Sequence, residues 1–448
     1  MNIGDTMQIS RYNFIKKIGN EDLFFNSNTC ALAIVNDDFK RVIDDIKKGV
    51  YKEDDYDPAL IAAMKKSGCI LEDDIDELKL IEFERNANKY QQTTLGLTIT
   101  PTLDCNFRCT YCFENHIKGL MSEKTQEALV SFVEKYSSQV NLLKIVWFGG
   151  EPMLCKDLIF KLTIKFKDIC KKNNIKYVAI MISNGSLIKE SDINALKLAD
   201  INNIQITIDG PPEIHNARRK TISGEDSFEK IITTVNDLLN NGINASIRIN
   251  IDKENMAKTY DLFYILKERI DRYRDLNIAF GKLTKFTEVC NLIEGHCYST
   301  MDFELIKLKL YERLIEMGFD RCKMKAYPKR RFNSCGADMA NSFVVDVDGN
   351  LFKCWNQAGC QNENCGNVFD GLKIGSKNFL SWVQWSPLDY PECRECKVLP
   401  LCMGSCPNYE GDTFHSNSGK ERNVVCEAIR YNMDDVLTFY YKLLRKKA

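Results

Sequence analysis

The grouping of the cysteines constrains this chain more than any other feature. Of 19 cysteines in 448 residues, three lie at Cys105, Cys109 and Cys112, and nine more lie from Cys335 to Cys426. The first residues lack a basic region followed by an apolar stretch, so no secretory signal is expected and the predicted location is cytoplasmic. Because cytoplasmic thiols stay reduced, metal binding or catalysis explains these groups better than a disulfide framework does.

The charge balance argues against several classes of partner. The chain carries 61 basic and 62 acidic residues and shows no polybasic face, so neither nucleic acid nor a membrane is an expected partner. No apolar run reaches the ~18 residues that are needed to cross a bilayer. Only four histidines are present, which leaves little for a histidine-based zinc site or a catalytic triad.

The middle of the chain alternates between short apolar runs and helical patterns. Strands are expected at residues 97–100, 145–148, 177–183, 204–209, 245–251 and 276–280. Helices are expected at residues 123–138, 156–171, 188–198, 228–240 and 257–270. Six such repeats predict an α/β fold with a parallel sheet. Since a closed eight-unit barrel takes ~250 residues, residues 95–300 are expected to form an open, partial (β/α)6 TIM-like barrel.

Two further units are expected beside this barrel. Residues 1–88 predict a small α+β domain with two helices, and the polar residues 86–94 read as a linker. Residues 320–448 predict a domain of short strands and cysteine-rich loops that ends in a helix at residues 428–444. Such dense cysteine loops need a bound group in order to fold.

The three clustered cysteines point to a reactive metal centre. Four cysteines close a zinc or iron–sulfur site, whereas Cys105, Cys109 and Cys112 leave one coordination position open for a reacting ligand. A structural zinc site that takes its fourth cysteine from elsewhere is the alternative.

Polar loops follow strands two to five, where the site of a parallel barrel lies. Glycines let the backbone approach a ligand, and a carboxylate such as Glu151 can bind an ammonium group. Each loop taken alone is also ordinary turn chemistry. Together the loops predict a ligand site next to the three cysteines.

The cysteine motif and the loops at the strand ends resemble those of a known family. The motif Cys105-x3-Cys109-x-Tyr111-Cys112, with GGEP, SNG and IDG loops after strands two to four, resembles the signature of radical S-adenosylmethionine (SAM) enzymes. The resemblance implies a [4Fe-4S] cluster on the three cysteines, whose open iron binds SAM. It also implies three sets of contacts with SAM. Gly149, Gly150 and Glu151 would lie near its amino group, and Ser183 and Asn184 near its ribose. Arg248 and Asn250 would lie near its carboxylate or ribose.

The C-terminal cysteines resemble the seven-cysteine SPASM domain of peptide-modifying radical enzymes. The resemblance implies two auxiliary [4Fe-4S] clusters, which with the first cluster makes three in all. One auxiliary cluster would be held by Cys335, Cys354 and Cys406, and the other by Cys393, Cys396, Cys402 and Cys426. The first set lacks a fourth ligand, for which Cys322 is our choice over Cys360, Cys365 or an open iron. A zinc ribbon is the alternative that spacing alone allows for the last cysteines.

Two weaker resemblances indicate a peptide substrate. Residues 208–219 resemble the strand-four loop of sulfatase-activating and peptide-maturing enzymes, with Asn216 where aspartate is usual. Residues 1–88 resemble the winged-helix element that binds the leader of a ribosomally made peptide.

The resemblances together imply a radical SAM oxidoreductase of the SPASM type. It would be a peptide maturase that cleaves SAM to a 5′-deoxyadenosyl radical, abstracts hydrogen from a precursor peptide and forms a thioether or other crosslink, as sactipeptide and ranthipeptide maturases do. The implied partners are a precursor peptide with its leader and a flavodoxin- or ferredoxin-type reductant. The alternatives are an anaerobic sulfatase-maturating enzyme and a non-catalytic iron–sulfur electron carrier or redox sensor. The sequence identifies no catalytic acid or base.

Overall fold

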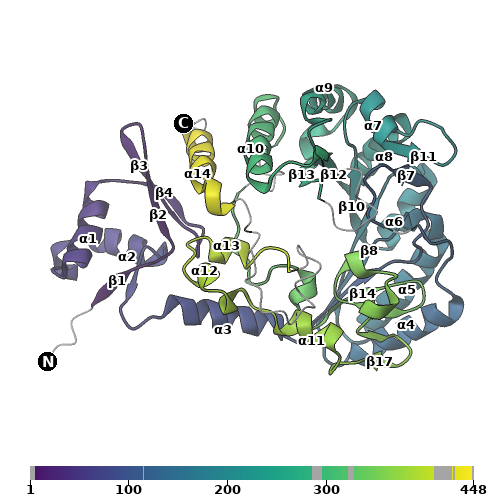
Figure 1. Cartoon of the computed structure of the whole chain (residues 1–448), viewed down its shortest axis with the longest axis horizontal. Helices are drawn as coiled ribbons and strands as arrows, with labels where there is room; N and C mark the ends of the chain where they lie inside the picture. The colour runs from purple at the N-terminus through teal and green to yellow at the C-terminus, as the bar shows by residue number, and fades with distance from the viewer. Residues whose placement is uncertain are drawn as a thin grey trace.

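The computed structural model describes residues 6–114, 116–284, 295–320, 327–407, 426 and 429–445 (Figure 1). An N-terminal unit is joined through a long helix, α3, to an open barrel, and the C-terminal unit lies between these two parts (Figure 1). No helix among these residues is long and apolar enough to cross a membrane.

Six parallel strands form the barrel, in the spatial order in which they follow one another along the chain. They are β6 Thr94–Ile99, β8 Leu142–Trp147, β9 Lys176–Ser183, β10 Ile201–Thr207, β12 Asn244–Ile251 and β13 Asn277–Lys282. The helices between them are α4 Glu123–Tyr136, α5 Lys156–Lys172, α6 Ile193–Leu198, α8 Phe228–Asn240 and α9 Thr259–Arg269. The sheet does not close on itself, so the predicted open (β/α)6 barrel is confirmed.

The apolar periodicity of these segments explains the arrangement. In β6, Leu95, Leu97 and Ile99 alternate with less buried residues and enter the main core. In α5, Ile159 and Phe166 lie on the buried side of the helix. Burial of such side chains contributes about 25 cal/mol per Å² of apolar surface removed from water.

The C-terminal unit extends the barrel sheet. Strand β14, Ser342–Val345, pairs in parallel with β6, and Val345 lies opposite Ile99. A tight turn then leads antiparallel into β15, Asn350–Phe352. Two short strands complete the sheet, β16 Gly366–Asn367 and β17 Gly371–Leu372. This pairing was not predicted; it covers an edge of β6 that a partial barrel leaves open.

The N-terminal unit contains an antiparallel three-stranded sheet and two helices. The strands are β2 Asn13–Ile18, β3 Glu21–Asn26 and β4 Leu32–Val35, and a separate pair is formed by β1 Met7–Ile9 and β5 Ile70–Glu72. The helices α1 Asp37–Lys48 and α2 Pro58–Lys66 pack through Val42, Ile61 and Met64 into a core of their own. The unit is therefore α+β, as expected.

Helix α3, Glu77–Lys89, corrects the predicted linker at residues 86–94. Arg85 and Lys89 are each 1% exposed, and both contact the buried carboxylate of Asp338 at 2.9 Å. Because the buried face of α3 carries charges where apolar residues would be expected, the hydrophobic pattern does not indicate a helix there. The consequence is a rigid connection between the N-terminal and C-terminal units.

Two long helices lie beside each other on the side of the N-terminal unit (Figure 1). They are α10, Thr300–Glu316, and α14, Ile429–Arg445, which is kinked at Asn432. The remaining helices of the C-terminal unit are α11 Lys377–Gln384, α12 Pro391–Arg394 and α13 Leu399–Cys402. The last two of these carry or flank the cysteines of the second ligand set.

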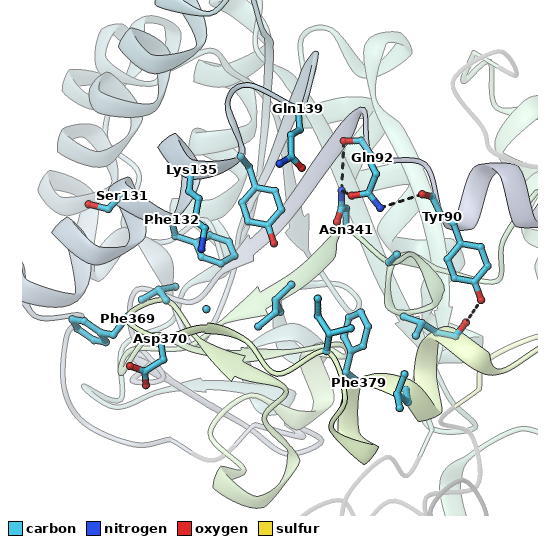
Figure 2. Close-up of a pocket in the computed structure, with 18 of the residues that line it drawn as sticks. Tyr90, Gln92, Ser131, Phe132, Lys135, Gln139, Asn341, Phe369, Asp370 and Phe379 are labelled. Carbon is cyan, nitrogen blue, oxygen red and sulfur yellow. Dashed lines mark hydrogen bonds between the residues drawn. The ribbon is translucent and has the colours of Figure 1, made fainter.

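A cavity of about 730 Å³ lies between α4, the segment after α3 and the C-terminal unit (Figure 2). The Asn341 side chain donates to Gln92 Oε1 at 2.8 Å, and the Tyr90 hydroxyl donates to the backbone oxygen of Val383 at 2.8 Å. The polar groups that Figure 2 joins by dashed lines thus make hydrogen bonds to one another. The described residues that line this cavity include no cysteine. This cavity is therefore not the predicted site.

Candidate active site

A second cavity, of about 280 Å³, lies at the carboxyl ends of the barrel strands and brings the predicted residues together. It is lined by Cys105, Cys109, Cys112, Gly149, Gly150, Ser183, Asn184, Arg248 and Asn250. Of the residues that the sequence predicts for the first cluster and for SAM, Glu151 alone is missing from this lining. The distribution agrees with the rule that parallel barrels place ligands beyond the carboxyl ends of their strands.

A short antiparallel pair holds the cysteine loop in place. Strand β7, Phe107–Cys109, pairs with β11, Arg219–Thr221, so that Cys109 lies opposite Arg219. The Phe107 amide also donates to Cys105 Sγ at 3.3 Å. Backbone pairing thus holds the cysteine loop against the loop after strand β10.

Burial keeps the thiols of this loop protonated. It raises the pKa of Cys105 and of Cys112 to about 12, with smaller contributions from neighbouring acidic groups. Burial also raises the pKa of Cys109, although the Arg219 guanidinium partly opposes the shift. Since metals bind thiolates, loading this site must release protons.

The donor set is that of an iron–sulfur cluster with one open iron. Within the described part of the chain, no three His, Cys, Asp or Glu side chains converge closely enough to hold one metal ion. In an iron–sulfur cluster each cysteine binds a different iron atom, so the thiolates stand further apart. The donor set of three cysteines around one cavity therefore fits the implied [4Fe-4S] group.

The two glycines of the GGEP loop serve close backbone packing. A Cβ at Gly149 would lie 2.3 Å from the backbone oxygen of Thr102, and one at Gly150 would lie 2.1 Å from that of Asp104. The amide of Glu151 donates to the same Asp104 oxygen at 2.9 Å. The glycines thus let the backbone of the GGEP loop lie against the cysteine loop. The sequence had instead suggested that they let the backbone approach a ligand.

Gly150→Ala is expected to destabilise this junction by about 1–3 kcal/mol, because backbone atoms rather than a mobile side chain oppose the new Cβ. Thermal unfolding and iron content after reconstitution measure the effect. Gly375→Ala is the matched control, since a Cβ there meets no atom within 4 Å. Equal melting temperatures for both variants would contradict the packing argument.

Glu151 connects two of the site loops. Its carboxylate is buried and accepts hydrogen bonds from the Met153 amide at 2.9 Å, the Ser183 hydroxyl at 2.8 Å and the Asn184 amide at 2.7 Å. Burial raises the pKa of Glu151, and these three hydrogen bonds partly offset the shift. The contact of this carboxylate with the SAM amino group stays a prediction, now beside an observed structural role.

Glu151→Gln is expected to weaken SAM binding tenfold or more without loss of iron, because one charge-assisted hydrogen bond contributes ~1.5–3 kcal/mol. Equilibrium binding of SAM to the reconstituted protein measures the change, and thermal unfolding reports the structural role separately. An unchanged dissociation constant with a lowered melting temperature would show that Glu151 only holds the loops together.

A buried polar network, which the sequence analysis did not identify, completes the wall of the cavity. The Tyr111 hydroxyl donates to Asp209, and it accepts from Arg219 Nη1 at 2.7 Å and from Asn250 Nδ2 at 3.3 Å. Arg248 Nε donates to Asn250 Oδ1 at 2.8 Å. Tyr111 stands inside the cysteine motif and Arg219 inside the quoted strand-four stretch, but nothing in the local pattern showed that the two would meet.

Asn216, which stands where aspartate is usual in the resembling stretch, holds the start of α8. Its Oδ1 accepts from the backbone amides of Ser227 and Phe228, both at 3.2 Å, at the start of α8. An asparagine side chain caps a helix as well as an aspartate does. Both amides at the start of α8 therefore have a partner in the strand-four region.

The C-terminal cysteines gather in the two groups that the resemblance implied. A small cavity of about 20 Å³ is lined by the four cysteines Cys393, Cys396, Cys402 and Cys426. Arg430 Nη1 donates to Cys426 Sγ at 3.0 Å. In the other group, burial and the nearby Cys335 and Cys406 raise the pKa of Cys354 to about 12. Cluster ligation by both groups remains a proposal.

The fourth ligand of the first group is not decided by these contacts. Our choice, Cys322, lies outside the described residues. Of its competitors, Cys365 is buried and donates through Sγ to the Leu351 oxygen at 3.2 Å, while Cys360 is exposed.

Comparison with known proteins decides the nature of the barrel. Residues 99–263 match the family model described as the Radical SAM superfamily. The chain carries a radical SAM domain. That domain spans the cysteine motif and the loops after strands two to five, so the family implied by the sequence is the one found.

The relatives include a sulfatase-maturating enzyme and a cyclopropyl synthase. The radical SAM chain is 24% identical over 374 residues to a cysteine-type anaerobic sulfatase-maturating enzyme of Clostridium perfringens, covering 75% of this chain and 94% of that protein. It is 22% identical over 444 residues to the radical SAM cyclopropyl synthase TigE of Paramaledivibacter caminithermalis, covering 89% of each.

Solved structures share the fold of the radical SAM chain. The structure of anSMEcpe with bound AdoMet and the Cp18Cys peptide has a TM-score of 0.59 at 22% identity and covers 78% of this chain and 99% of that one. Streptococcus suis SuiB bound to the precursor peptide SuiA has a TM-score of 0.52 at 14% identity and covers 90% and 96%.

Proposed function

We propose that this radical SAM protein is a peptide maturase that crosslinks a ribosomally made precursor. The observation that carries the proposal is the share of this chain that each relative covers. TigE and SuiB match about nine-tenths of the chain, whereas the sulfatase-maturating relatives match about three-quarters. The N-terminal unit fits this larger coverage, because its sheet is one to which the leader of a precursor peptide can bind.

When bound, SAM and the clusters would supply a hydrogen acceptor and an electron acceptor, so that the peptide loses two hydrogen atoms as a thioether or other crosslink forms. The residues of this chain bind and orient the reactants. In the proposed arrangement Cys105, Cys109 and Cys112 hold the first cluster, and the loops after strands two to five hold SAM. The buried network around Tyr111 keeps those loops in a fixed geometry.

The C-terminal unit reaches the mouth of the same cavity. Trp355 and Asn356 line the cavity, and the Trp355 ring stacks on Phe148 with centroids 5.4 Å apart. Both residues follow Cys354 directly in the sequence. An auxiliary cluster on Cys354 would therefore lie beside the place where a substrate side chain meets SAM, a suitable position for accepting an electron or binding a thiolate.

The N-terminal unit offers an edge strand for a leader. Strand β4 pairs with β3 on one side, and no described strand pairs with its other side. Ile34 of β4 is 41% exposed. An extended peptide that adds a strand to such an edge gains main-chain hydrogen bonds, and side-chain pockets give specificity. We propose that residues 1–88 bind the leader in this way.

Sulfatase maturation is the second candidate function, and the similarity to the Clostridium perfringens enzyme favours it. A direct comparison separates the two candidates. A reconstituted maturase is expected to modify a precursor encoded beside its gene and to leave a cysteine-bearing sulfatase peptide unchanged. Formation of formylglycine in the sulfatase peptide would favour the alternative.

Iron content tests the proposed clusters. Anaerobic reconstitution is expected to load about 12 iron atoms per chain, because the three ligand sets provide for three four-iron clusters. A flavodoxin- or ferredoxin-type protein is the proposed electron donor. A chain that binds zinc at the C-terminal cysteines would load only about a third of this iron.

A further inference from the structure

The N-terminal unit packs against two of the cysteines that are proposed to hold the second auxiliary cluster. Tyr12 and Ile81 share a buried core with Cys393 and Leu399, and Cys396 packs against that core. Two sequence segments that are almost 400 residues apart thus meet beside the ligands of a proposed cluster.

Polar contacts hold the two parts together. Arg11 and Glu395 form an ion pair at 2.9 Å. Ser27 donates to the backbone oxygen of Lys397, whose ammonium group in turn donates to the Asn13 oxygen at 3.4 Å. Contacts to the N-terminal unit therefore flank Cys396 directly on both sides in the sequence.

The Tyr12 hydroxyl is the one feature of this interface without an explanation. The residue is 0% exposed, and its buried hydroxyl oxygen has no hydrogen-bond partner among the residues that the structure describes. The main chain of Tyr12 is fixed, because its oxygen accepts from the Ser27 amide at 3.1 Å. A buried hydroxyl that bonds to nothing costs about 1–3 kcal/mol. Its position against a cysteine group indicates a partner that is bound there.

We propose that the Tyr12 hydroxyl donates a hydrogen bond to a sulfur atom of the auxiliary cluster held by Cys393, Cys396, Cys402 and Cys426. The inference rests on the proposed function, which supplies that cluster. A phenol keeps its proton at neutral pH and can donate. Hydrogen bonds to cluster sulfurs favour the more negative, reduced state and raise the reduction potential. The leader-binding unit is therefore also a positioning unit for an electron-transfer site.

Tyr12→Phe tests this role, because it removes the hydroxyl and keeps the ring in the shared core. The control is Tyr56→Phe in the same unit, where the lost hydroxyl donates to Asp45 at 2.6 Å, away from the cysteines. Redox titration of reconstituted protein, followed by electron paramagnetic resonance, measures each cluster. In Tyr12→Phe we expect one couple to move to a lower potential by up to a tenfold change in its equilibrium constant, about 59 mV for one electron.

The possible failures can be told apart. Full iron loading with all potentials equal in wild type, Tyr12→Phe and Tyr56→Phe would overturn the hydrogen bond and leave the proposed function standing. If Cys393→Ala removes no iron and no resonance signal, then the second auxiliary cluster does not exist, and both the proposed cluster and this inference fail.

Discussion

Replacing Cys105, Cys109 and Cys112 together by alanine is expected to remove about a third of the iron and all cleavage of SAM, because one of three four-iron clusters loses every protein ligand. The three residues line one cavity with the loops proposed to bind SAM. The C-terminal cysteines form separate groups and should keep their iron. Iron analysis and quantification of methionine and 5′-deoxyadenosine measure the two effects.

Cys170→Ala provides the matched control. Cys170 is buried in the apolar face of α5 and belongs to none of the three proposed ligand sets. Its loss should lower stability slightly and leave iron and SAM cleavage unchanged. Cleavage that survives the triple change, or vanishes with Cys170→Ala, would remove the basis for the first cluster.

The second large effect concerns recognition of the leader. Ile34→Asp on the edge strand β4 is expected to weaken binding of a labelled full-length precursor at least tenfold and to abolish its crosslinking. A peptide strand added there would cover this side chain, whose burial contributes ~1.5–3 kcal/mol, and the variant would bury a charge instead. Fluorescence anisotropy gives the affinity, and mass spectrometry gives the extent of crosslinking.

Ile15→Asp is the corresponding control, because Ile15 lies on β2, the other outer strand of the same sheet, and is 45% exposed. It should bind the precursor normally. Both variants should retain slow cleavage of SAM without peptide, since the proposed SAM ligands lie in the barrel. Equal precursor affinity for wild type and both variants would exclude β4 as the binding edge.

Point substitutions are a cleaner test than deletion of residues 1–88. Tyr12 and Ile81 belong to a core that contains Cys393 and Leu399. Removal of the unit would expose that core and would take Arg85 away from the buried Asp338 carboxylate. Loss of crosslinking after such a deletion would therefore not identify a binding role.

The barrel was predictable because its signals are local. Short apolar runs alternate with helical periodicity, and each strand found lies within a few residues of the expected one. The site loops followed from the same reasoning, since topology alone places the ends of parallel strands together. Cys105 and Asn184, which are far apart in sequence, approach to 3.9 Å between Sγ and Nδ2 in this way.

Non-local pairing was not predictable from the same patterns. Helix α3 buries Arg85 and Lys89 against a carboxylate about 250 residues later, and only the folded chain shows why those charges are tolerated. The pairing of Arg219 with Cys109 depends likewise on a short strand that forms only where two loops meet. Long-range partners of this kind leave no periodic signal in the sequence.

Formation of 5′-deoxyadenosine tests the central claim most directly. Anaerobically reconstituted full-length protein, given SAM, a strong reductant and a precursor peptide encoded beside its gene, is expected to produce 5′-deoxyadenosine and methionine in equal amounts. The peptide should lose the mass of two hydrogen atoms in step with them. Protein that carries its full iron content and yet forms no 5′-deoxyadenosine would contradict the assignment of Cys105, Cys109 and Cys112 to a radical SAM centre.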